Sequence, residues 1–193
     1  LKTFGRNNKG VGWPKKKDAI IRYEMMSKII KNKKANNLIL DLGCGLSHFY
    51  KHLKFKKFKI RYIGVDLSEK MIEISKRQYP KNRYFVLDVL KDHSKLPKVD
   101  YIIMNGLFTN KGKYSNHVML KFLKSVLKVC INKVNIGLSF NVFSEFVDFK
   151  EKENFYLNLK TITDFIYKNI GNKFIINHHY GLYEYTIFIY KKI

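Results

Sequence analysis

The sequence predicts an α/β protein built on a doubly wound, mostly parallel sheet of about seven strands, the last antiparallel, with helices on both faces. Short apolar runs alternate along the chain with stretches of helical spacing, and this alternation is typical of parallel sheets. A glycine turn follows the first apolar run, and a polar residue closes each of the first four. At 193 residues the chain suits one domain with one sizeable core.

The expected elements follow in order from this alternation. A first helix over 18–30 has apolar residues at helical spacing, among them Ile21, Met25 and Ile29. Ser68 is placed to cap a helix after the second strand. Further helices are expected over 46–55, 117–129 and 162–170. Strands are expected over 38–42, 62–65, 83–87, 99–104 and 134–140, followed by a final hairpin of 173–178 and 183–190 that turns at Gly181.

The net charge of +23 comes mainly from lysine, which supplies 33 of the 38 basic residues. Lysine spread along the whole chain is typical of a solvated surface and of AT-rich coding sequence, whereas nucleic-acid grooves favour clustered arginine. A nucleic-acid partner is therefore left open but not favoured. Because a positive field steers anions, we expect a small substrate that is anionic.

The longest apolar runs are too short to cross a bilayer, and residues 1–17 lack the apolar stretch of a signal peptide. The two cysteines, Cys44 and Cys130, suggest no disulfide framework. We expect a cytoplasmic protein with no membrane partner. The oligomeric state is left open.

Polar residues stand where successive strands of the predicted sheet end. Asp41, Asp66, Asp88 and Asn105 each follow an apolar run. In an open parallel sheet, ligands bind beyond the carboxyl ends of the strands, where the strand order reverses. Any one of these residues could be a turn former or a helix cap. The ordered set favours a ligand with several hydroxyl or amine groups.

The glycine turn narrows the class of ligand. Its sequence, Gly43-Cys44-Gly45-Leu46-Ser47-His48, has His48 where a dinucleotide-binding turn has its third glycine. This departure argues against NAD or FAD, while two glycines still let the backbone approach a ligand closely. Asp66 follows Gly45 by 21 residues, about the spacing at which a carboxylate reaches ribose hydroxyls.

At these residues the sequence resembles the class I S-adenosylmethionine-dependent methyltransferases. The segment Ile39–Gly45 is similar to their first motif and Ile63–Ser68 to their second, with Asp88-Val89 and Asn105–Phe108 in the places of the third and fourth. Ser47 departs from the family, which often has a glycine there. The resemblance extends to a little-characterised bacterial subgroup that shares Gly12-Trp13, Arg22-Tyr23, a Phe140–Asp148 segment and a Leu182–Tyr185 ending.

The resemblance implies a Rossmann-like core over 36–193, an N-terminal arm and helix over 1–35 that cover the active site, and S-adenosyl-L-methionine as cofactor. The glycine turn would line its methionine part, Asp66 would bind the ribose, and Asp88 with Val89 would read the adenine. The residues expected to bind the cofactor are Trp13, Arg22, Asp41, Gly43, Cys44, Gly45, Asp66, Leu67, Met71, Asp88, Val89, Asn105 and Gly106. A surface salt bridge is the alternative for Arg22, helix core for Met71, and an anchor of the arm for Trp13.

The aromatic segment 141–156 is expected to be a loop that carries acceptor specificity, since apolar walls with a few polar groups suit a small-molecule pocket. Phe108, Asn141, Ser144 and Tyr183 are the expected acceptor-binding residues. Asp148 and His179 are the candidate general bases. No metal is expected, because His48 and His52 lack a third ligand and are expected to form an exposed pair.

Three functions remain open on sequence. The first is methylation of a small molecule, such as a phosphorylated metabolite or a glycan precursor. The second is methylation of RNA through the lysine-rich surface. The third is a cofactor-binding partner subunit without catalysis of its own. A residue change at Asp66 is expected to weaken cofactor binding while leaving the stability of the ligand-free fold nearly intact.

Overall fold

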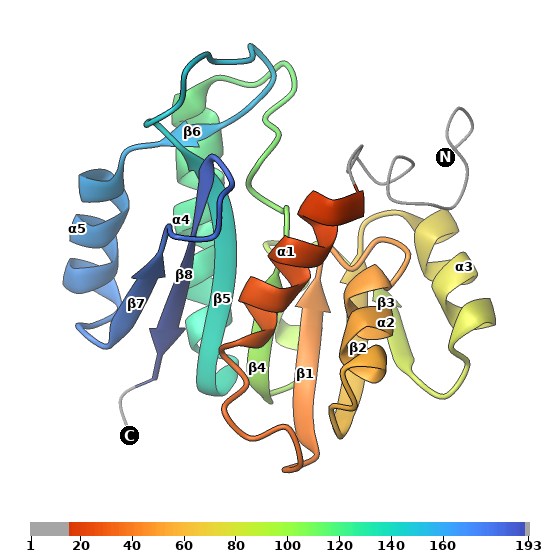
Figure 1. Ribbon diagram of the computed structural model, residues 1–193. Coiled ribbons are helices and arrows are strands. Elements are labelled where there is room, and N and C mark those ends of the chain that lie inside the picture. The colour runs from red at the N-terminus through yellow and green to blue at the C-terminus, as the bar shows by residue number, and fades with distance from the viewer. Residues whose placement is uncertain (1–15, 192–193) are drawn as a thin grey trace.

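A computed structural model describes residues 16–191, which form a sheet in the strand order β3-β2-β1-β4-β5-β8-β7 (Figure 1). All neighbours on this path are parallel except β8, which runs antiparallel to both β5 and β7. The order reverses beside β1, as expected for a doubly wound sheet. The strands are β1 (Asn37–Leu42), β2 (Ile60–Asp66), β3 (Arg83–Val86), β4 (Val99–Met104), β5 (Val134–Ser144), β6 (Tyr156–Leu157), β7 (Phe174–Asn177) and β8 (Glu184–Tyr190).

Helices cover both faces of the sheet, as predicted (Figure 1). On one face lie α1 (Lys16–Ser27), α2 (His48–Phe55) and α3 (Glu69–Gln78); on the other lie α4 (Asn116–Ile131) and α5 (Leu159–Asn169). Ser68 caps α3 as expected, its hydroxyl accepting from Met71 N. A short 3₁₀ turn, η2 (His93–Lys95), precedes β4.

The alternation of side chains along β5 sorts the core into two layers. Leu138, Phe140 and Val142 pack into the large cluster beneath α4 and α5. The side chains of Ser139, Asn141 and Phe143 point to the opposite face, because successive side chains of a strand alternate. On that face α1 and α2 pack over Ile39, Tyr101, Ile103 and Phe188.

The fifth strand is longer than the sequence indicated. It runs to Ser144, so residues 141–144, which we assigned to a loop, are strand. The reason is long-range pairing, since β8 lies along β5 as far as the pair Phe143 and Glu184. The last helix also begins earlier than predicted, because Asn158 caps it by accepting from Thr161 N. The two-residue strand β6 was not predicted, since two residues carry no periodicity.

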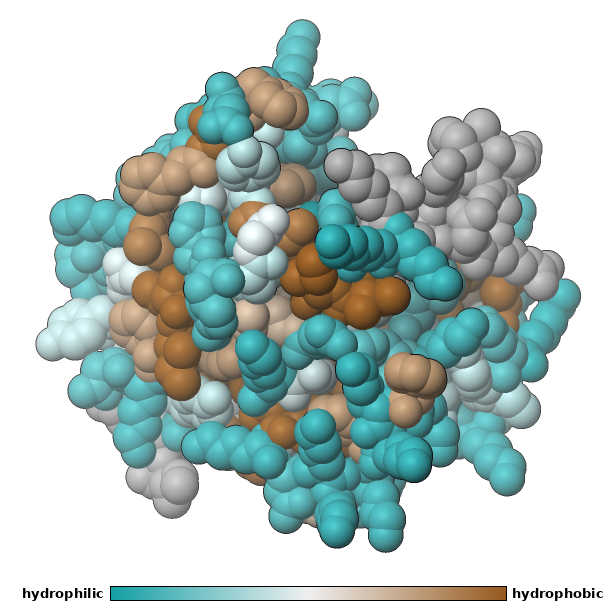
Figure 2. Space-filling view, viewed as in Figure 1, coloured by the Kyte–Doolittle hydropathy of each residue, from teal (hydrophilic) through white to brown (hydrophobic). Residues whose placement is uncertain are grey.

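Hydrophilic side chains cover most of the face that carries α1 and α2 (Figure 2). Within residues 16–191, no helix has the length and apolar character needed to pass through a bilayer.

Gly137→Ala is expected to lower the free energy of unfolding by about 2–3 kcal/mol, as overpacking of a core does. A Cβ at this position would lie 2.7 Å from the Ile189 carbonyl oxygen. That oxygen belongs to the backbone of β8 and cannot rotate away. Urea unfolding of the two proteins measures the loss, and equal midpoints would contradict it.

Candidate functional site

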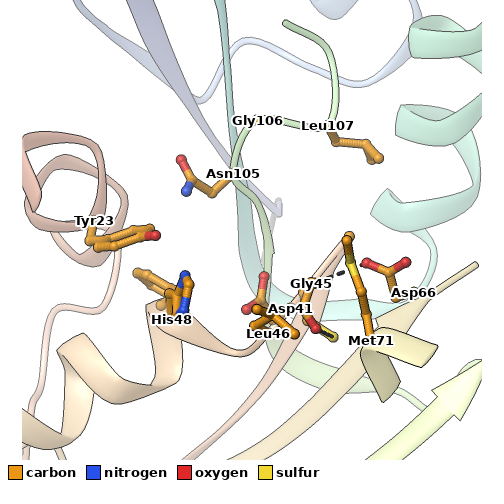
Figure 3. A pocket seen from close by; sticks show the side chains of 13 residues that line it. Tyr23, Asp41, Gly45, Leu46, His48, Asp66, Met71, Asn105, Gly106 and Leu107 are labelled. Atoms are coloured by element: carbon orange, nitrogen blue, oxygen red, sulfur yellow. Dashed lines mark hydrogen bonds between the residues drawn. The ribbon is translucent and has the colours of Figure 1, made fainter. Parts of the chain in front are cut away.

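A cavity of about 310 Å³ opens at the carboxyl ends of β1, β2 and β4. It lies where the strand order reverses, the place at which open α/β sheets bind ligands. Figure 3 shows Tyr23 and His48 on one side and Asp66 and Met71 on the other. The residues that line it are Tyr23, Asp41, Gly43, Cys44, Gly45, Leu46, His48, Phe49, Asp66, Met71, Asn105, Gly106 and Leu107.

The glycine turn between β1 and α2 forms the floor of this cavity. Gly43 and Gly45 have φ angles of +78° and +52°, in the region that glycine adopts without strain. Gly43 N and Cys44 N donate to the Val65 carbonyl, which holds the turn against β2. Ser47 has φ +56°, so it adopts the left-handed conformation without being glycine. Its side chain is buried and its hydroxyl donates to Tyr84 Oη at 3.2 Å.

Asp66 at the end of β2 holds the turn from the other side. Its Oδ2 accepts from Gly45 N at 2.9 Å, and its Oδ1 accepts from Ser68 N at 2.9 Å. Each carboxylate oxygen has a second lone pair for a further donor. The carboxylate therefore remains able to accept hydrogen bonds from ligand hydroxyls in the cavity.

Asp41 at the end of β1 is almost fully buried and accepts from Tyr62 Oη at 2.6 Å. Burial raises the pKa of this carboxyl to about 7, against the lowering effect of the Tyr62 hydrogen bond and with the help of the nearby Asp66 charge. A buried carboxylate that lines a cavity attracts a cationic ligand, since a positive charge would offset the cost of ionising it.

Asn105 and Gly106, just beyond β4, form the opposite wall. Gly106 N donates to Asn141 Oδ1 at 2.7 Å, so the fully buried Asn141 of β5 fixes the backbone of this wall. Asn105 Oδ1 is buried with no hydrogen-bond partner among the described residues. A buried oxygen of this kind at a cavity wall is suited to a ligand donor.

Tyr23 and His48 line the cavity although the sequence did not indicate them. Tyr23 of α1 packs its ring against Phe49 and His52, and burial raises the pKa of its hydroxyl above the usual value. The expectation that His48 and His52 form an exposed pair is wrong, because His52 is buried and its ring contacts Tyr23. Helical spacing shows which side chains of α1 and α2 are buried, but not that a cavity lies between them.

Arg22, expected to contact the cofactor, forms an ion pair with a residue of β8. Its Nε donates to Glu184 Oε2 at 2.9 Å, and both side chains are buried. The alternative of a surface salt bridge is therefore wrong, because this ion pair is buried. Glu184 opens β8, so this ion pair ties α1 to the antiparallel strand. Tyr180 adds a hydrogen bond to Thr186 on the same strand.

Several other expected residues lie outside the cavity lining. Leu67 is 71% exposed, and Val89 packs into the large core cluster. Asp88 Oδ1 accepts from Leu90 N at 3.0 Å, so this carboxylate caps its own turn. Trp13 lies outside the described residues.

The residues expected to bind the acceptor do not lie together in the structure. Phe108 is fully buried between Phe122 and Phe140, so its side chain belongs to the core and contributes no cavity wall, contrary to expectation. Ser144 faces a separate cavity beneath α5. Tyr183 donates to Asp148 in a third, smaller cavity beyond β5. His179 is exposed in the turn before β8.

Among residues 16–191, no group of three or more His, Cys, Asp or Glu side chains could hold a metal ion. The cavity instead combines close backbone approach at Gly43 and Gly45 with strand-end carboxylates at Asp41 and Asp66. A doubly wound sheet with these features defines a Rossmann-like protein that binds a nucleoside-containing cofactor.

Comparisons with known proteins narrow this class. Residues 39–130 match the family model described as a methyltransferase domain. A protein of Mycobacterium tuberculosis with the provisional name methyltransferase Rv1506c is 25% identical over 157 residues, which cover 79% of this chain and 92% of the relative.

Solved structures of methyltransferases share the fold. The magnesium protoporphyrin IX methyltransferase of Synechocystis, with bound S-adenosylmethionine, has a TM-score of 0.62 and 13% identity over 89% of this chain and 78% of its own. Human N-acetylserotonin methyltransferase, also with S-adenosylmethionine, has a TM-score of 0.61 and 13% identity over 100% of this chain and 62% of its own. Residues 39–130 therefore match a methyltransferase domain, and the chain has the fold of S-adenosylmethionine-dependent methyltransferases.

Proposed function

We propose that this methyltransferase acts on a small molecule, which enters the cavity between α1 and the wall formed by Asn105 and Gly106. The observation that carries the proposal is the cavity itself, about 310 Å³ in volume and bordered on one side by Tyr23 and His48. Magnesium protoporphyrin IX and N-acetylserotonin, named for two proteins of the same fold, are small molecules. We propose that α1 covers the active site and that 36–193 is the Rossmann-like core.

The cavity residues fit S-adenosylmethionine. We assign its ribose hydroxyls to the spare lone pairs of Asp66, and its methionine part to the glycine turn, where Gly43 and Gly45 let the backbone approach closely. Met71 lies beside Asp66 and supplies a polarisable apolar surface for the adenine. The buried Asp41 carboxylate offsets the positive charge of the ligand, and Asn105 Oδ1 accepts from its ammonium group.

When bound, the cofactor supplies a methyl group that a nucleophile attacks from the side opposite the sulfur. The chain's own residues hold the two partners in line, and such positioning can supply much of the rate acceleration. The wall at Gly106 is held by Asn141, so the geometry depends on a buried hydrogen bond rather than on a mobile side chain. A neutral nitrogen acceptor needs no base. For a hydroxyl acceptor, His48 is the one imidazole among the described lining residues and the candidate to receive the proton.

Asp148 and His179 do not fit the role of general base in this arrangement. Neither belongs to the cavity lining, and both are exposed. The expectation of an anionic acceptor also finds no support here, because none of the described lining residues is Lys or Arg.

The test is a methyl-transfer assay with labelled S-adenosylmethionine against a metabolite extract, with bulk RNA as the competing acceptor. We expect label in a small molecule, and we expect S-adenosylmethionine but not NAD to raise the melting temperature, since binding to the native state alone stabilises it. Label in RNA alone would favour the alternative that the protein methylates RNA. A cofactor that binds without transferring label to either would favour a non-catalytic partner subunit.

Asp66→Ala is expected to weaken S-adenosylmethionine binding by about 1.5–3 kcal/mol, the scale of hydrogen bonds to a charged group. The ligand-free protein is also expected to lose about 1–2 kcal/mol, because Gly45 N and Ser68 N lose their acceptor. The expectation of nearly unchanged stability is revised for this reason. Calorimetric titration measures the affinity, and an unchanged dissociation constant in the folded variant would refute the assignment. Glu69→Ala, exposed on the same turn, is the control.

A further inference from the structure

The cavity that holds Asp148 and Tyr183, of about 170 Å³, lies beyond the end of β5 and has aromatic walls. Phe143, Phe149, Tyr156 and Tyr183 line it, and we call them the aromatic cage. The rings of Phe143 and Tyr156 are 5.7 Å apart between centroids. Phe149 is 70% exposed and Tyr183 53% exposed, so two large rings stand at the surface without a core to cover them. Exposed aromatic rings around a cavity indicate a binding site.

Two carboxylates, of Asp148 and Glu151, share this cavity with the rings. Asp148 accepts from the Tyr183 hydroxyl, and Glu151 accepts from Asn154 Nδ2 at 2.7 Å. Neither forms an ion pair with a basic side chain within residues 16–191. The chain has 38 basic residues against 15 acidic ones, so two carboxylates that face a cavity without such a partner are informative. They make the cage a site for positive charge.

The chain itself shows that one ring of the cage accepts an ammonium group. Lys150 places its Nζ over the Tyr156 ring, 5.7 Å from the centroid. A cation over an aromatic face is attracted by the negative charge density of the ring. Aromatic faces together with nearby carboxylates are the chemistry that recognises alkylated ammonium groups, which carry too few hydrogens for carboxylates alone to bind well.

The cage lies on the same side of the sheet as the cofactor cavity. Asn141, which holds the wall at Gly106, and Phe143 of the cage are two residues apart on β5 and point to the same face. At about 3.3 Å per residue, the two positions are separated by roughly 7 Å along the strand. The segment that carries Asp148 is tied in place by Phe155 N, which donates to Thr109 O, and by Lys111 N, which donates to Glu153 O.

We propose that the aromatic cage binds an amine or quaternary ammonium group of the methyl acceptor, and so selects acceptors that carry such a group. This inference rests on the proposed function, because only a methyltransferase has a methyl acceptor. The binding of an ammonium group to the cage does not depend on it. It replaces the expectation of an anionic acceptor. Asp148 and Tyr183 thereby bind substrate rather than move a proton.

The probe is choline, compared with its neutral isostere 3,3-dimethylbutan-1-ol, in ligand-observed NMR titrations at matched ionic strength. We expect choline to bind about tenfold more tightly than the isostere. Phe149→Leu and Asp148→Asn are each expected to weaken choline binding about fivefold. Both side chains are exposed, so the variants are expected to fold. Phe146→Leu, which removes an equally exposed ring from the same segment but outside the cage, is expected to change nothing.

Equal binding of choline and the isostere would overturn the proposal, and so would an equal loss in Phe146→Leu and Phe149→Leu. S-adenosylmethionine binding is titrated in the same samples and is expected to be unchanged in all three variants. If the wild-type protein binds choline and the isostere equally but still binds S-adenosylmethionine, the cage is refuted and the proposed function is not. Absence of cofactor binding in the wild-type protein refutes the proposed function and leaves the choline result to be judged separately.

Discussion

Arg22→Met is expected to lower the free energy of unfolding by about 3–5 kcal/mol at pH 8, the scale for removing one partner of a buried ion pair. Glu184 is fully buried and would keep its charge without the Arg22 guanidinium. Burial already raises the pKa of Glu184, and the charge of Arg22 has the largest lowering effect on that pKa. The variant therefore raises this pKa further.

The loss in Arg22→Met is expected to shrink as the pH falls. A carboxyl whose pKa is higher in the folded than in the unfolded state binds more protons when folded, so stability falls as the pH rises through that window. Denaturant unfolding at pH 5 and pH 8 measures the difference. The double variant Arg22→Met with Glu184→Leu is the control and is expected to recover most of the loss, since it leaves no buried charge. A loss of the same size at both pH values would contradict the ionic explanation.

Asp41→Asn is the other substitution that is expected to change the free energy of unfolding strongly. The pKa of Asp41 rises from 3.8 to about 7 on folding, chiefly through burial. A shift of about three units corresponds to about 4 kcal/mol, which the wild-type protein loses as the pH rises from about 4 to about 7. The variant lacks this titration. The stability difference between variant and wild type should therefore change by up to about 4 kcal/mol in favour of the variant across this window.

The Asp41 carboxyl also couples cofactor binding to the release of a proton. A ligand with net positive charge beside Asp41 favours the ionised form, so S-adenosylmethionine is expected to release a proton on binding near pH 7. Calorimetric titration in two buffers of different ionisation enthalpy measures that proton. Asp41→Asn should abolish the buffer dependence, while Asp18→Asn, a carboxyl change in the first turn of α1, should preserve it. Buffer-independent heats in the wild-type protein would rule out the coupling.

Much of the sheet and half of the cavity could be predicted from local patterns. Asp41, Asp66 and Asn105 are strand-end residues that line one cavity, because parallel strands bring their carboxyl ends to one edge. The hairpin of β7 and β8 was predicted from two apolar runs around Gly181. These features depend on periodicity and on chain order, both of which can be read directly.

The other half of the cavity depends on contacts between distant segments. Tyr23 lines it because α1 docks beside α2, and Arg22 meets Glu184 across 162 positions of sequence. Phe108 was expected to contact the acceptor because it follows Asn105, but the turn at Gly106 directs it into the core, against Phe140. Neither periodicity nor residue spacing gives the direction of a side chain after such a turn.

The ion pair between α1 and β8 joins two segments that we expect to meet late in refolding. Strands β1 to β4 lie close together in sequence and can associate early, whereas contacts of large sequence separation carry a higher entropic cost of loop closure. Glu184 reaches Arg22 only when β8 has entered the sheet between β5 and β7. Tyr23, the next residue on α1, already contacts Phe49 and His52 of α2, so the ion pair gives the helix that borders the cavity a second anchor, on the far side of the sheet order.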